Sequence, residues 1–495
     1  MSLIRSTVVG VLLSLGATLG WAAPPQTVSA ARATAAVERE LDVRAKPWSG
    51  DFDAMVQRRV IRFLVPYSRT LSFVDHGVER GVTAEFARDF ERWINARYKA
   101  RLGKRPVTVF LLVTPRDKML ERLNEGRGDI IAGNLTVTDE RLKFLDFVAP
   151  RDRTLIRELV VTGPSAPKLG SLEDLAGRTV YARPSSATHD SLVALDARLR
   201  DAGKPGLKIM ATPEELSDED ALELVNAGAL DTYVVDDWIA RLWAQVLPKI
   251  VVRDDLVLRD GDYTGWAFRK NSPQLQAAIE AFYAEQVKKR GSIDARVARF
   301  HKRFKQIANN TGGAEAKRFQ STIGLFRTYG DRYDFDPLML AAQGFQESRL
   351  DQKARSPVGA IGVMQVMPAT GAELKVGNIR VTENNIHAGT KYMDQLMERE
   401  FSDAKFSQHD RALFAFAAYN AGPGNIRRMR GEAEKRGLDP NKWFDNVELV
   451  VADKIGYETT TYVRNIFKYY AAYRLTVDAE SASEKAQQRL SAPER

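Results

Sequence analysis

The chain has 495 residues, of which 44% are hydrophobic, and a formal net charge of +9. This length is too great for one ordinary domain, so two or three are expected. The charge excess is small, and no lysine- and arginine-rich stretch with interleaved aromatics stands out, so nucleic acid is not an expected partner. A mildly basic chain would suit an acidic polymer, and plain solubility explains the charge equally well.

The sequence contains no cysteine and only five histidines. Disulfides, thiolate nucleophiles, cysteine zinc sites and lipid attachment through an N-terminal cysteine are therefore excluded. The histidines show no spacing typical of a metal site, such as H-E-x-x-H. We therefore expect neither a metal nor a cofactor.

The first residues are typical of an export signal. Arg5 precedes the apolar run Val8–Leu19, and small residues then permit cleavage before Ala23. The run is short for a membrane span, although an uncleaved anchor is the alternative. We therefore expect a signal peptide at 1–22, a leader or linker at 23–57, and an exported mature protein.

From Val60 onward, segments rich in β-branched and aromatic residues alternate with helical segments. This alternation predicts α/β structure with a mostly parallel sheet. The pattern runs twice, so two α/β lobes are expected, in a domain that covers 58–299. The expected strands are Val60–Val65, Val107–Val113, Ile130–Gly133, Thr179–Tyr181, Lys208–Met210 and Thr232–Val235, and the expected helices are Thr83–Arg97, Asp117–Glu125, one from about His189, and Asp218–Ala227.

Three stretches of this region carry a resemblance. Gly128–Ile131, Asn134–Arg141 and Phe147–Pro150 resemble the most recognisable part of the family 3 bacterial extracellular solute-binding proteins, which take amino acids. The resemblance implies a two-lobed, periplasmic-binding-protein-like fold over about 61–290. It departs at Gly81–Phe86, where the family has Gly-x-Asp-x-Asp-Leu. The ligand is therefore open: an amino acid, a wall stem peptide, or none.

The same resemblance implies a ligand site. The positions that match the family are Thr136, Arg141 and Asp236, and Ser185 and Ser186 are added because they precede an expected helix. Arg141 would hold the ligand carboxylate, since a guanidinium makes paired hydrogen bonds to a planar carboxylate. Asp236 would receive the amino group, and the serines precede a helix whose free N–H groups favour an anion. The alternatives are an ion pair of Arg141 with Asp139 or Asp146, and helix capping by the serines and Asp236.

Helices dominate after an expected linker at 300–317, where the short basic run His301–Lys305 precedes a probable hinge, Asn309–Gly313. A mainly α domain is expected over 318–478, with a polar tail at 479–495. The expected helices are Phe319–Tyr333, Pro337–Arg349, Pro368–Leu374, Asn385–Phe401, Gln408–Asn420 and Thr459–Arg474.

Glu347 lies at the end of an apolar helical stretch. Asp336 is a good N-cap for that helix, and Pro337 suits its first position. Burial raises the pKa of a glutamate, and a raised pKa suits a general acid near neutral pH. A lone glutamate in such a place is more often an ordinary solvated residue.

Four further blocks change this interpretation. They are Gly362–Gln365, Asn385–Gly389, Ala418–Gly422 and Tyr462–Ile466. Together with Glu347–Ser348, and in this order, they resemble the lytic transglycosylases related to soluble lytic transglycosylase and goose-type lysozyme. The resemblance covers about 320–474 and implies a lysozyme-like α domain. The departures, Val363 for a usual Leu and Leu350 for a usual Phe, do not touch the chemistry.

The resemblance implies a single-acid reaction. Hydrolytic glycosidases commonly use two carboxylates, and no matching position supplies a second, since Asp351 falls where the family places a solvent-facing residue. Glu347 would protonate the oxygen between N-acetylmuramic acid and N-acetylglucosamine, then take the proton of the sugar's own 6-hydroxyl, which gives a 1,6-anhydro product without water. The implied substrate-binding residues are Ser348, Met364, Gln365, Tyr419, Asn420 and Tyr462, with Tyr462 bonded toward Glu347; core packing or capping is the alternative for each.

The combination of an export signal, a solute-binding-type domain and a transglycosylase-like domain resembles the membrane-bound lytic murein transglycosylase F family. That resemblance implies a periplasmic enzyme that acts on peptidoglycan and lies peripherally at the inner face of the outer membrane. Two other functions remain open: a hydrolytic muramidase, and a receptor for wall ligands whose catalytic-like domain is inactive.

Overall fold

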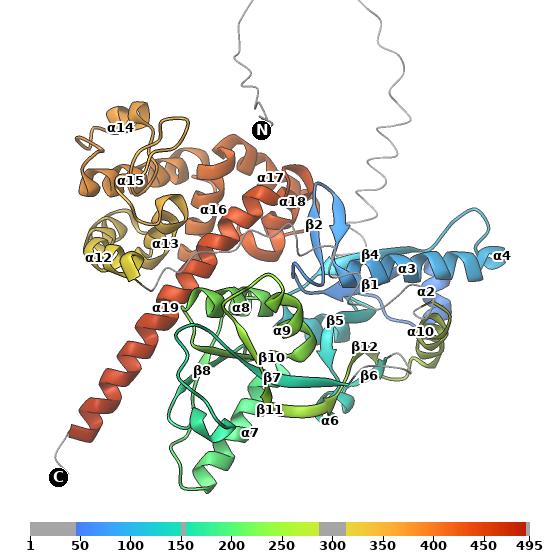
Figure 1. Ribbon diagram of the computed structural model, residues 1–495. Helices are drawn as coiled ribbons and strands as arrows, with labels where there is room; N and C mark the ends of the chain where they lie inside the picture. Colours follow the sequence, from blue (N-terminus) through green and yellow to red (C-terminus); the bar gives the residue numbers. More distant parts are fainter. Residues whose placement is uncertain (1–45, 150–154, 287–312, 492–495) are drawn as a thin grey trace, which may run out of the picture.

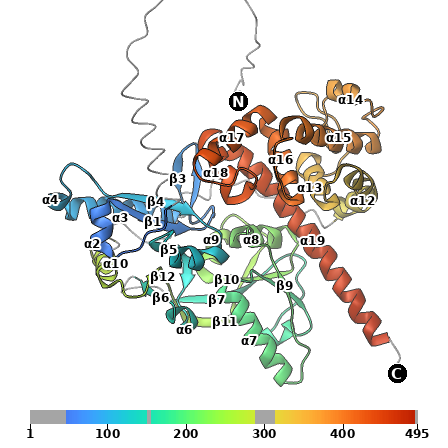
Figure 2. The same ribbon diagram turned by 180° about the vertical axis from the view of Figure 1, so that it is seen from behind.

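The computed structural model describes residues 46–149, 155–286 and 313–491 (Figure 1). The expected signal peptide at 1–22, most of the leader at 23–57 and most of the linker at 300–317 lie outside these ranges. The described residues form two α/β lobes and a helical domain (Figures 1 and 2). Within these ranges no helix combines the length and the apolar character that a bilayer crossing requires.

The first lobe is built on a five-stranded sheet in the order β4-β1-β5-β12-β6. β1 pairs in parallel with β4 and β5, and β12 runs antiparallel between β5 and β6, so the sheet is mostly parallel as expected. Phe63, Phe90, Trp266 and Phe282 pack together beneath it. The elements are α2 (Phe52–Arg58), β1 (Val60–Val65), β2 (Phe73–Asp75), β3 (Val78–Arg80), α3 (Val82–Arg97), α4 (Lys99–Leu102), β4 (Thr108–Val113), η1 (Arg116–Lys118), α5 (Met119–Asn124), β5 (Ile130–Thr136), α6 (Asp139–Leu142), β6 (Leu145–Val148), β12 (Thr264–Arg269) and α10 (Pro273–Gln286).

Helix α2 falls in the stretch that the sequence pattern placed in the leader. Its residues Phe52, Met55 and Val56 are buried in the same apolar cluster as Phe63 and Phe90. The α/β core therefore includes residues that precede the first strand.

The second lobe has an antiparallel sheet in the order β10-β7-β11 and a separate parallel pair, β8-β9. The expectation of a mostly parallel sheet is wrong for this lobe. Alternating strands and helices reveal which elements follow one another, but they do not reveal which strands become neighbours. Parallel pairing occurs where α7 connects β8 to β9. The elements are β7 (Ile156–Thr162), η2 (Leu172–Leu175), β8 (Thr179–Ala182), α7 (Ala187–Asp201), β9 (Lys208–Ala211), α8 (Asp218–Ala227), β10 (Thr232–Asp236), α9 (Asp237–Ala244) and β11 (Val251–Asp262).

In the helical domain α13 packs against α12 and α19, and the core of the domain continues into the second lobe. Leu222 and Trp243 of the lobe belong to the same contiguous apolar cluster as Phe326 and Phe345 of the helical domain. The elements are α12 (Gly313–Tyr333), α13 (Pro337–Ser348), α14 (Pro368–Leu374), α15 (Thr382–Glu400), α16 (Gln408–Ala421), α17 (Pro423–Lys435), η4 (Trp443–Val447), α18 (Glu448–Lys454) and α19 (Tyr457–Ser491).

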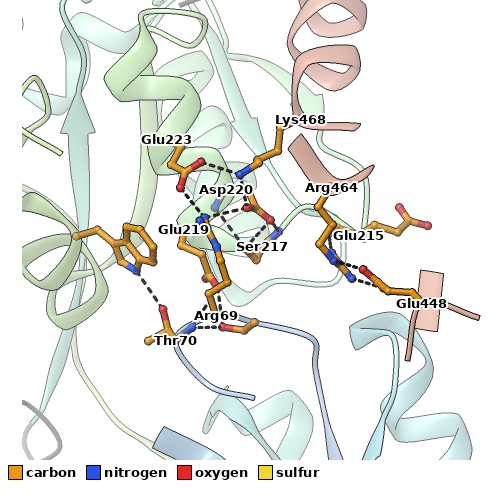
Figure 3. Close-up of polar contacts among 12 residues, drawn as sticks. Arg69, Thr70, Glu215, Ser217, Glu219, Asp220, Glu223, Glu448, Arg464 and Lys468 are labelled. Atoms are coloured by element: carbon orange, nitrogen blue, oxygen red, sulfur yellow. Dashed lines mark hydrogen bonds and ion pairs between the residues drawn. The ribbon is translucent and has the colours of Figure 1, made fainter. Parts of the chain in front are cut away.

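An ion cluster buried on α8 joins all three parts (Figure 3). Arg69, from the loop after β1, lies 2.7 Å from Glu223 and 3.1 Å from Asp220. Lys468, on α19, lies 2.7 Å from Glu223 and 3.4 Å from Asp220. All four side chains are at most 7% exposed. Buried charges are tolerated only when they are paired, so the cluster fixes α19 against both lobes.

A second ionic contact of α19 involves Arg464, which lies one turn before Lys468. Arg464 donates to both carboxylate oxygens of Glu448, at 2.5 and 2.8 Å (Figure 3). Its guanidinium also lies 3.3 Å from the centroid of the Tyr67 ring of the first lobe. In both overall views α19 extends from the helical domain past α8 (Figures 1 and 2).

Candidate active site and interlobe cleft

Glu347 stands in the last turn of α13. The Asp336 side chain caps the start of this helix by accepting from the Leu338 N–H at 2.8 Å, as expected. The helix ends because Arg349 adopts a left-handed conformation with φ 56°. Burial raises the pKa of Glu347 to about 7, and a hydrogen bond from Tyr462 acts in the opposite direction. A carboxyl group with this pKa can both give and take a proton near neutral pH.

Two tyrosines from different helices surround that carboxyl group. The Tyr462 hydroxyl, from α19, donates to Glu347 Oε1 at 2.5 Å. The Tyr419 hydroxyl, from α16, donates to the Met364 carbonyl at 2.8 Å. Burial, with the nearby Glu347 carboxylate, holds the pKa of Tyr419 well above its usual range. Both phenols therefore stay protonated and serve as hydrogen-bond donors.

The segment 356–366 folds back over α13. The Ser348 hydroxyl donates to the Val363 carbonyl at 2.8 Å. Asn385 of α15 accepts from the Met364 N–H and donates to the Ile361 carbonyl, both at 2.8 Å. Gly362 has φ 79°, and a Cβ there would lie 2.7 Å from the Asn385 amide. This close approach explains why a glycine is required at that position.

The expected substrate-binding residues divide by exposure. Asn420 is exposed, and Tyr419 and Tyr462 are half-buried beside Glu347. The half-buried Gln365 donates from its amide to the Gly362 carbonyl at 2.9 Å. The hydroxyl of Ser348 donates to the Val363 carbonyl and accepts from the Asp351 N–H, so it supports the 356–366 segment, and its role toward a sugar stays a prediction.

The Met364 side chain is fully buried. It packs against Gly389, where an added Cβ would lie 2.6 Å from the Met364 Cβ. Glycine on α15 thus makes room for the methionine inside the core. The Met364 carbonyl accepts from the Tyr419 hydroxyl, so the backbone of Met364 lies beside the site, and its role in sugar binding stays a prediction.

The five expected ligand residues of the α/β domain come together around one cavity between the lobes. Its volume is about 60 Å³. Strand β5 and α6 of the first lobe supply Thr136 and Arg141, and the second lobe supplies the other three. The lining residues are Arg116, Met119, Asn134, Leu135, Thr136, Arg141, Arg183, Ser185, Ser186, Ala187, Thr188, Asp218, Val235 and Asp236.

Arg141 spans this cavity from one lobe to the other. Its guanidinium donates to the Thr136 carbonyl at 2.8 Å and to the Ser185 carbonyl at 3.3 Å. Burial lowers its pKa from the usual value. The alternative ion pair with Asp146 is not formed, because Asp146 pairs with Lys270 at 2.8 Å.

The second-lobe residues of the cavity already have polar partners. Ser185 donates to Glu214 at 2.6 Å, and Ser186 caps α7 by accepting from the His189 N–H at 3.1 Å. Burial raises the pKa of Asp236 to about 7.

Asn134 of the first lobe donates a hydrogen bond to Asp236 of the second lobe at 2.8 Å. The sequence interpretation missed Asn134, although it lies within the stretch Asn134–Arg141 that carried the resemblance. The sequence contained no signal for Arg116 and Arg183, since only the closing of the two lobes brings them to the cavity. Across the residues that the structure describes, no group of three or more histidine or acidic side chains converges as a metal site would.

Comparison with known proteins identifies both parts of the chain. The family model "Transglycosylase SLT domain" matches residues 324–441, and "Bacterial extracellular solute-binding proteins, family 3" matches residues 66–303. The helical domain and the pair of lobes therefore correspond to two known families.

Curated relatives match this chain along most of its length. A protein of Desulfosudis oleivorans named membrane-bound lytic murein transglycosylase F is 29% identical over 376 residues, which cover 72% of this chain and 79% of the relative. A protein of the same name from Aeromonas hydrophila is 25% identical over 446 residues, 85% and 84% of the two chains. Among solved structures, holo ArgBP from T. maritima is 24% identical, with a TM-score of 0.37, and covers 50% of this chain and 99% of that chain.

Proposed function

We propose that this chain, which belongs to the family of membrane-bound lytic murein transglycosylase F, cleaves peptidoglycan with Glu347 as its single acid and base. The observation that carries the proposal is the state of that carboxyl group. It is half-buried, its pKa is raised to about 7, and its immediate polar neighbours are phenols. A phenol cannot replace the second carboxylate that hydrolysis commonly uses.

In the proposed reaction Glu347 first donates a proton to the glycan and later takes one from it. Protonated Glu347 gives its proton to the oxygen between N-acetylmuramic acid and N-acetylglucosamine, and the bond from that oxygen to the anomeric carbon breaks. The resulting carboxylate takes the proton of the muramic 6-hydroxyl, whose oxygen bonds to the anomeric carbon. The products are a free N-acetylglucosamine 4-hydroxyl and a 1,6-anhydromuramic end. No water is consumed, and Glu347 is again protonated.

The hydrogen bond from Tyr462 supports both halves of this cycle. It occupies Oε1 of Glu347, which leaves the second oxygen for the substrate. It also stabilises the carboxylate after the proton has left. Asn420 is exposed next to Tyr419, and its amide is suited to orient a sugar acetamido group.

Product analysis tests this function directly. We expect wild-type protein to release anhydromuramic ends from purified peptidoglycan, and Glu347→Gln to release none while its fold is unchanged. Asp351→Asn removes the carboxylate four residues further on and should leave release intact. The masses of the products are measured by mass spectrometry.

Each other outcome identifies a different function. Reducing ends from the wild-type protein would identify a hydrolytic muramidase. Binding to peptidoglycan without release would identify a receptor with an inactive domain. Release by Glu347→Gln at the wild-type rate would remove Glu347 from the mechanism.

The α/β domain is proposed to bind an amino acid or a wall peptide through Thr136, Arg141, Ser185, Ser186 and Asp236, and through this binding to regulate catalysis. An amino acid needs more room than 60 Å³, since ligand pockets commonly measure about 300–1,000 Å³. A cavity of about 830 Å³ adjoins it where the lobes face the helical domain, and Arg116 and Arg183 line both. A ligand longer than one amino acid would extend from the small cavity into the large one, which favours a peptide.

The relatives are named membrane-bound, and we place this chain outside the cytoplasm in association with a membrane. The finer location, peripheral at the inner face of the outer membrane of the periplasm, is part of the same proposal. Fractionation of cells in salt and in carbonate tests it: a peripheral protein is released by carbonate and an inserted one is retained.

A further inference from the structure

Two arginines stand where the small cavity between the lobes meets the large cavity beside the helical domain. Of the described residues, only Arg116 and Arg183 line both cavities, whose volumes are about 60 and 830 Å³. Arg116 lies in η1 of the first lobe, and Arg183 directly follows β8 of the second lobe. A ligand that extends from one cavity into the other must therefore pass both arginines.

The two guanidinium groups have one carboxylate between them. Arg183 is only 3% exposed and pairs with Asp218 at 2.9 Å, while its Nε has no hydrogen-bond partner among the described residues. Arg116 is half-buried and donates to the Gly133 carbonyl at 2.6 Å, and it forms no ion pair with any carboxylate that the structure describes. Burial lowers the pKa of Arg116, and the positive charge of Arg183 lowers it further.

The walls of the small cavity carry the same excess of positive charge. The described residues that line it include three arginines and two aspartates, and no other charged side chain. Asp218 pairs with Arg183, and Asp236 accepts a hydrogen bond from Asn134. Charges removed from water need a partner of opposite sign, so these walls favour a ligand that brings more negative than positive charge.

We propose that Arg116 and Arg183 form a second anion-binding site, and that the ligand of the α/β domain carries a second carboxylate, as an acidic amino acid or an acidic peptide does. Arg141 holds the first carboxylate and Asp236 receives the amino group. The second carboxylate lies against the two remaining guanidinium groups, whose parallel N–H donors match its planar shape. This inference rests on the proposed ligand site and adds to it the charge of the ligand.

Ligand pairs that differ by one carboxylate test this inference. Calorimetry with the full chain compares alanyl-glutamate with alanyl-glutamine, and free glutamate with free glutamine. In at least one pair we expect the acid to bind at least about tenfold more tightly than the amide, because the amide leaves buried guanidinium groups without a counter-charge. The pair that shows the larger preference identifies a peptide or a single amino acid as the source of the second carboxylate.

A substitution of Arg116 shows which residues cause the preference. Arg116 is chosen because its loss leaves no buried carboxylate without a partner, whereas loss of Arg183 would leave Asp218 unpaired. We expect Arg116→Gln to reduce the preference for the acid to within about threefold and to leave affinity for the amide unchanged. Arg122→Gln removes an exposed arginine that lines only the large cavity, and it should keep the full preference. Circular dichroism confirms that each variant is folded, and Arg116→Lys, which keeps the charge, should retain part of the preference.

Other results overturn the second anion-binding site. Equal affinity for acid and amide in the wild type, or an undiminished preference in folded Arg116→Gln, would each refute it. Failure of the proposed ligand site has a different signature: Arg141→Ala would then bind acid and amide as tightly as the wild type does. If none of the four ligands binds, both the ligand site and this inference are wrong. None of these measurements involves a glycan, so they do not depend on the role of Glu347.

Discussion

At the scale of single residues, the proposed reaction depends on the Glu347 carboxyl group, which has both apolar neighbours and a phenol beside it. Glu347 ends an apolar helix, and the water it loses by burial raises its pKa more than the Tyr462 hydrogen bond lowers it. Asp236, between the lobes, has a pKa raised to about 7, first by burial and further by the nearby acidic residues Asp218, Glu158 and Asp237, against its hydrogen bond from Asn134. Both carboxyl groups are therefore partly protonated near pH 7. In the proposed function, Glu347 exchanges its proton with a glycan oxygen and Asp236 receives an amino group.

The raised pKa of Glu347 predicts how stability depends on pH. The unfolded chain releases this proton near pH 4.5 and the folded chain near pH 7, so the folded state becomes less stable as pH rises through that window. Glu347→Gln has no proton to release. We expect the two proteins to unfold equally at pH 4, and the variant to be more stable above pH 7 by up to about 3 kcal/mol.

Denaturant unfolding at both pH values measures this difference. The comparison of wild type with Glu347→Gln at pH 4 is the control for any effect of the glutamine side chain on packing. A stability gap of the same size at pH 4 and pH 8 would contradict the raised pKa.

At the scale of elements, α19 connects the parts of the molecule. It supplies Tyr462 to the Glu347 carboxyl group and Arg464 to the ring of Tyr67. It also supplies Arg464 to Glu448 and Lys468 to the acidic residues of α8 (Figure 3). These side chains lie within two turns of one another. A shift of either lobe against α19 would therefore act on the helix that also holds the donor to Glu347.

The buried ion cluster predicts unequal effects of two substitutions on this helix. Lys468→Met leaves Asp220 and Glu223 with Arg69 alone, and we expect it to lower the free energy of unfolding by about 3 kcal/mol, as loss of one partner of a buried pair does. Arg474→Met removes an exposed pair with Asp478 on the same helix and should cost less than about 0.5 kcal/mol. Denaturant titrations of both variants provide the comparison, and equal losses would show that the cluster does not stabilise the junction.

At the scale of the whole molecule, the second lobe and the helical domain share one apolar core, and the cavity between the lobes has a volume of about 60 Å³. The core of the helical domain continues into α8 and α9, and Arg141 bridges the lobes through two carbonyl groups. If the proposed ligand binds there, the hydrogen bonds of Arg141 to the two carbonyl groups must be exchanged for bonds to the ligand.

A calorimetric screen of amino acids and wall stem peptides tests the proposed ligand site. We expect a ligand to bind and Arg141→Ala to weaken its binding at least about tenfold, because charge-assisted hydrogen bonds to a carboxylate contribute about 1.5–3 kcal/mol each. Arg97→Ala removes an exposed arginine of the same lobe and should bind as the wild type does. Equal affinity of wild type and Arg141→Ala would exclude the proposed role.

The sequence by itself determined the local elements and their chemistry. Val60–Val65, Asp218–Ala227 and Pro368–Leu374 are found at the predicted bounds, because β-branched content, a capping serine and an N-terminal proline act within a few residues. The partial burial of Glu347 could be expected for the same reason, since the apolar helix that carries it is local, and its role as the acid stays a proposal.

Only the tertiary structure decided what depends on contacts between distant segments. The antiparallel second sheet and the burial of Met364 each require elements that lie far apart along the chain. The bond between Tyr462 and Glu347 also joins distant segments, but the resemblance of the motifs had already predicted it. α19 continues to Ser491, beyond the expected Arg474, and meets α8 through a lysine that the sequence pattern could not single out. Local patterns report propensity and periodicity, whereas these features arise from the free energy of packing one segment against another.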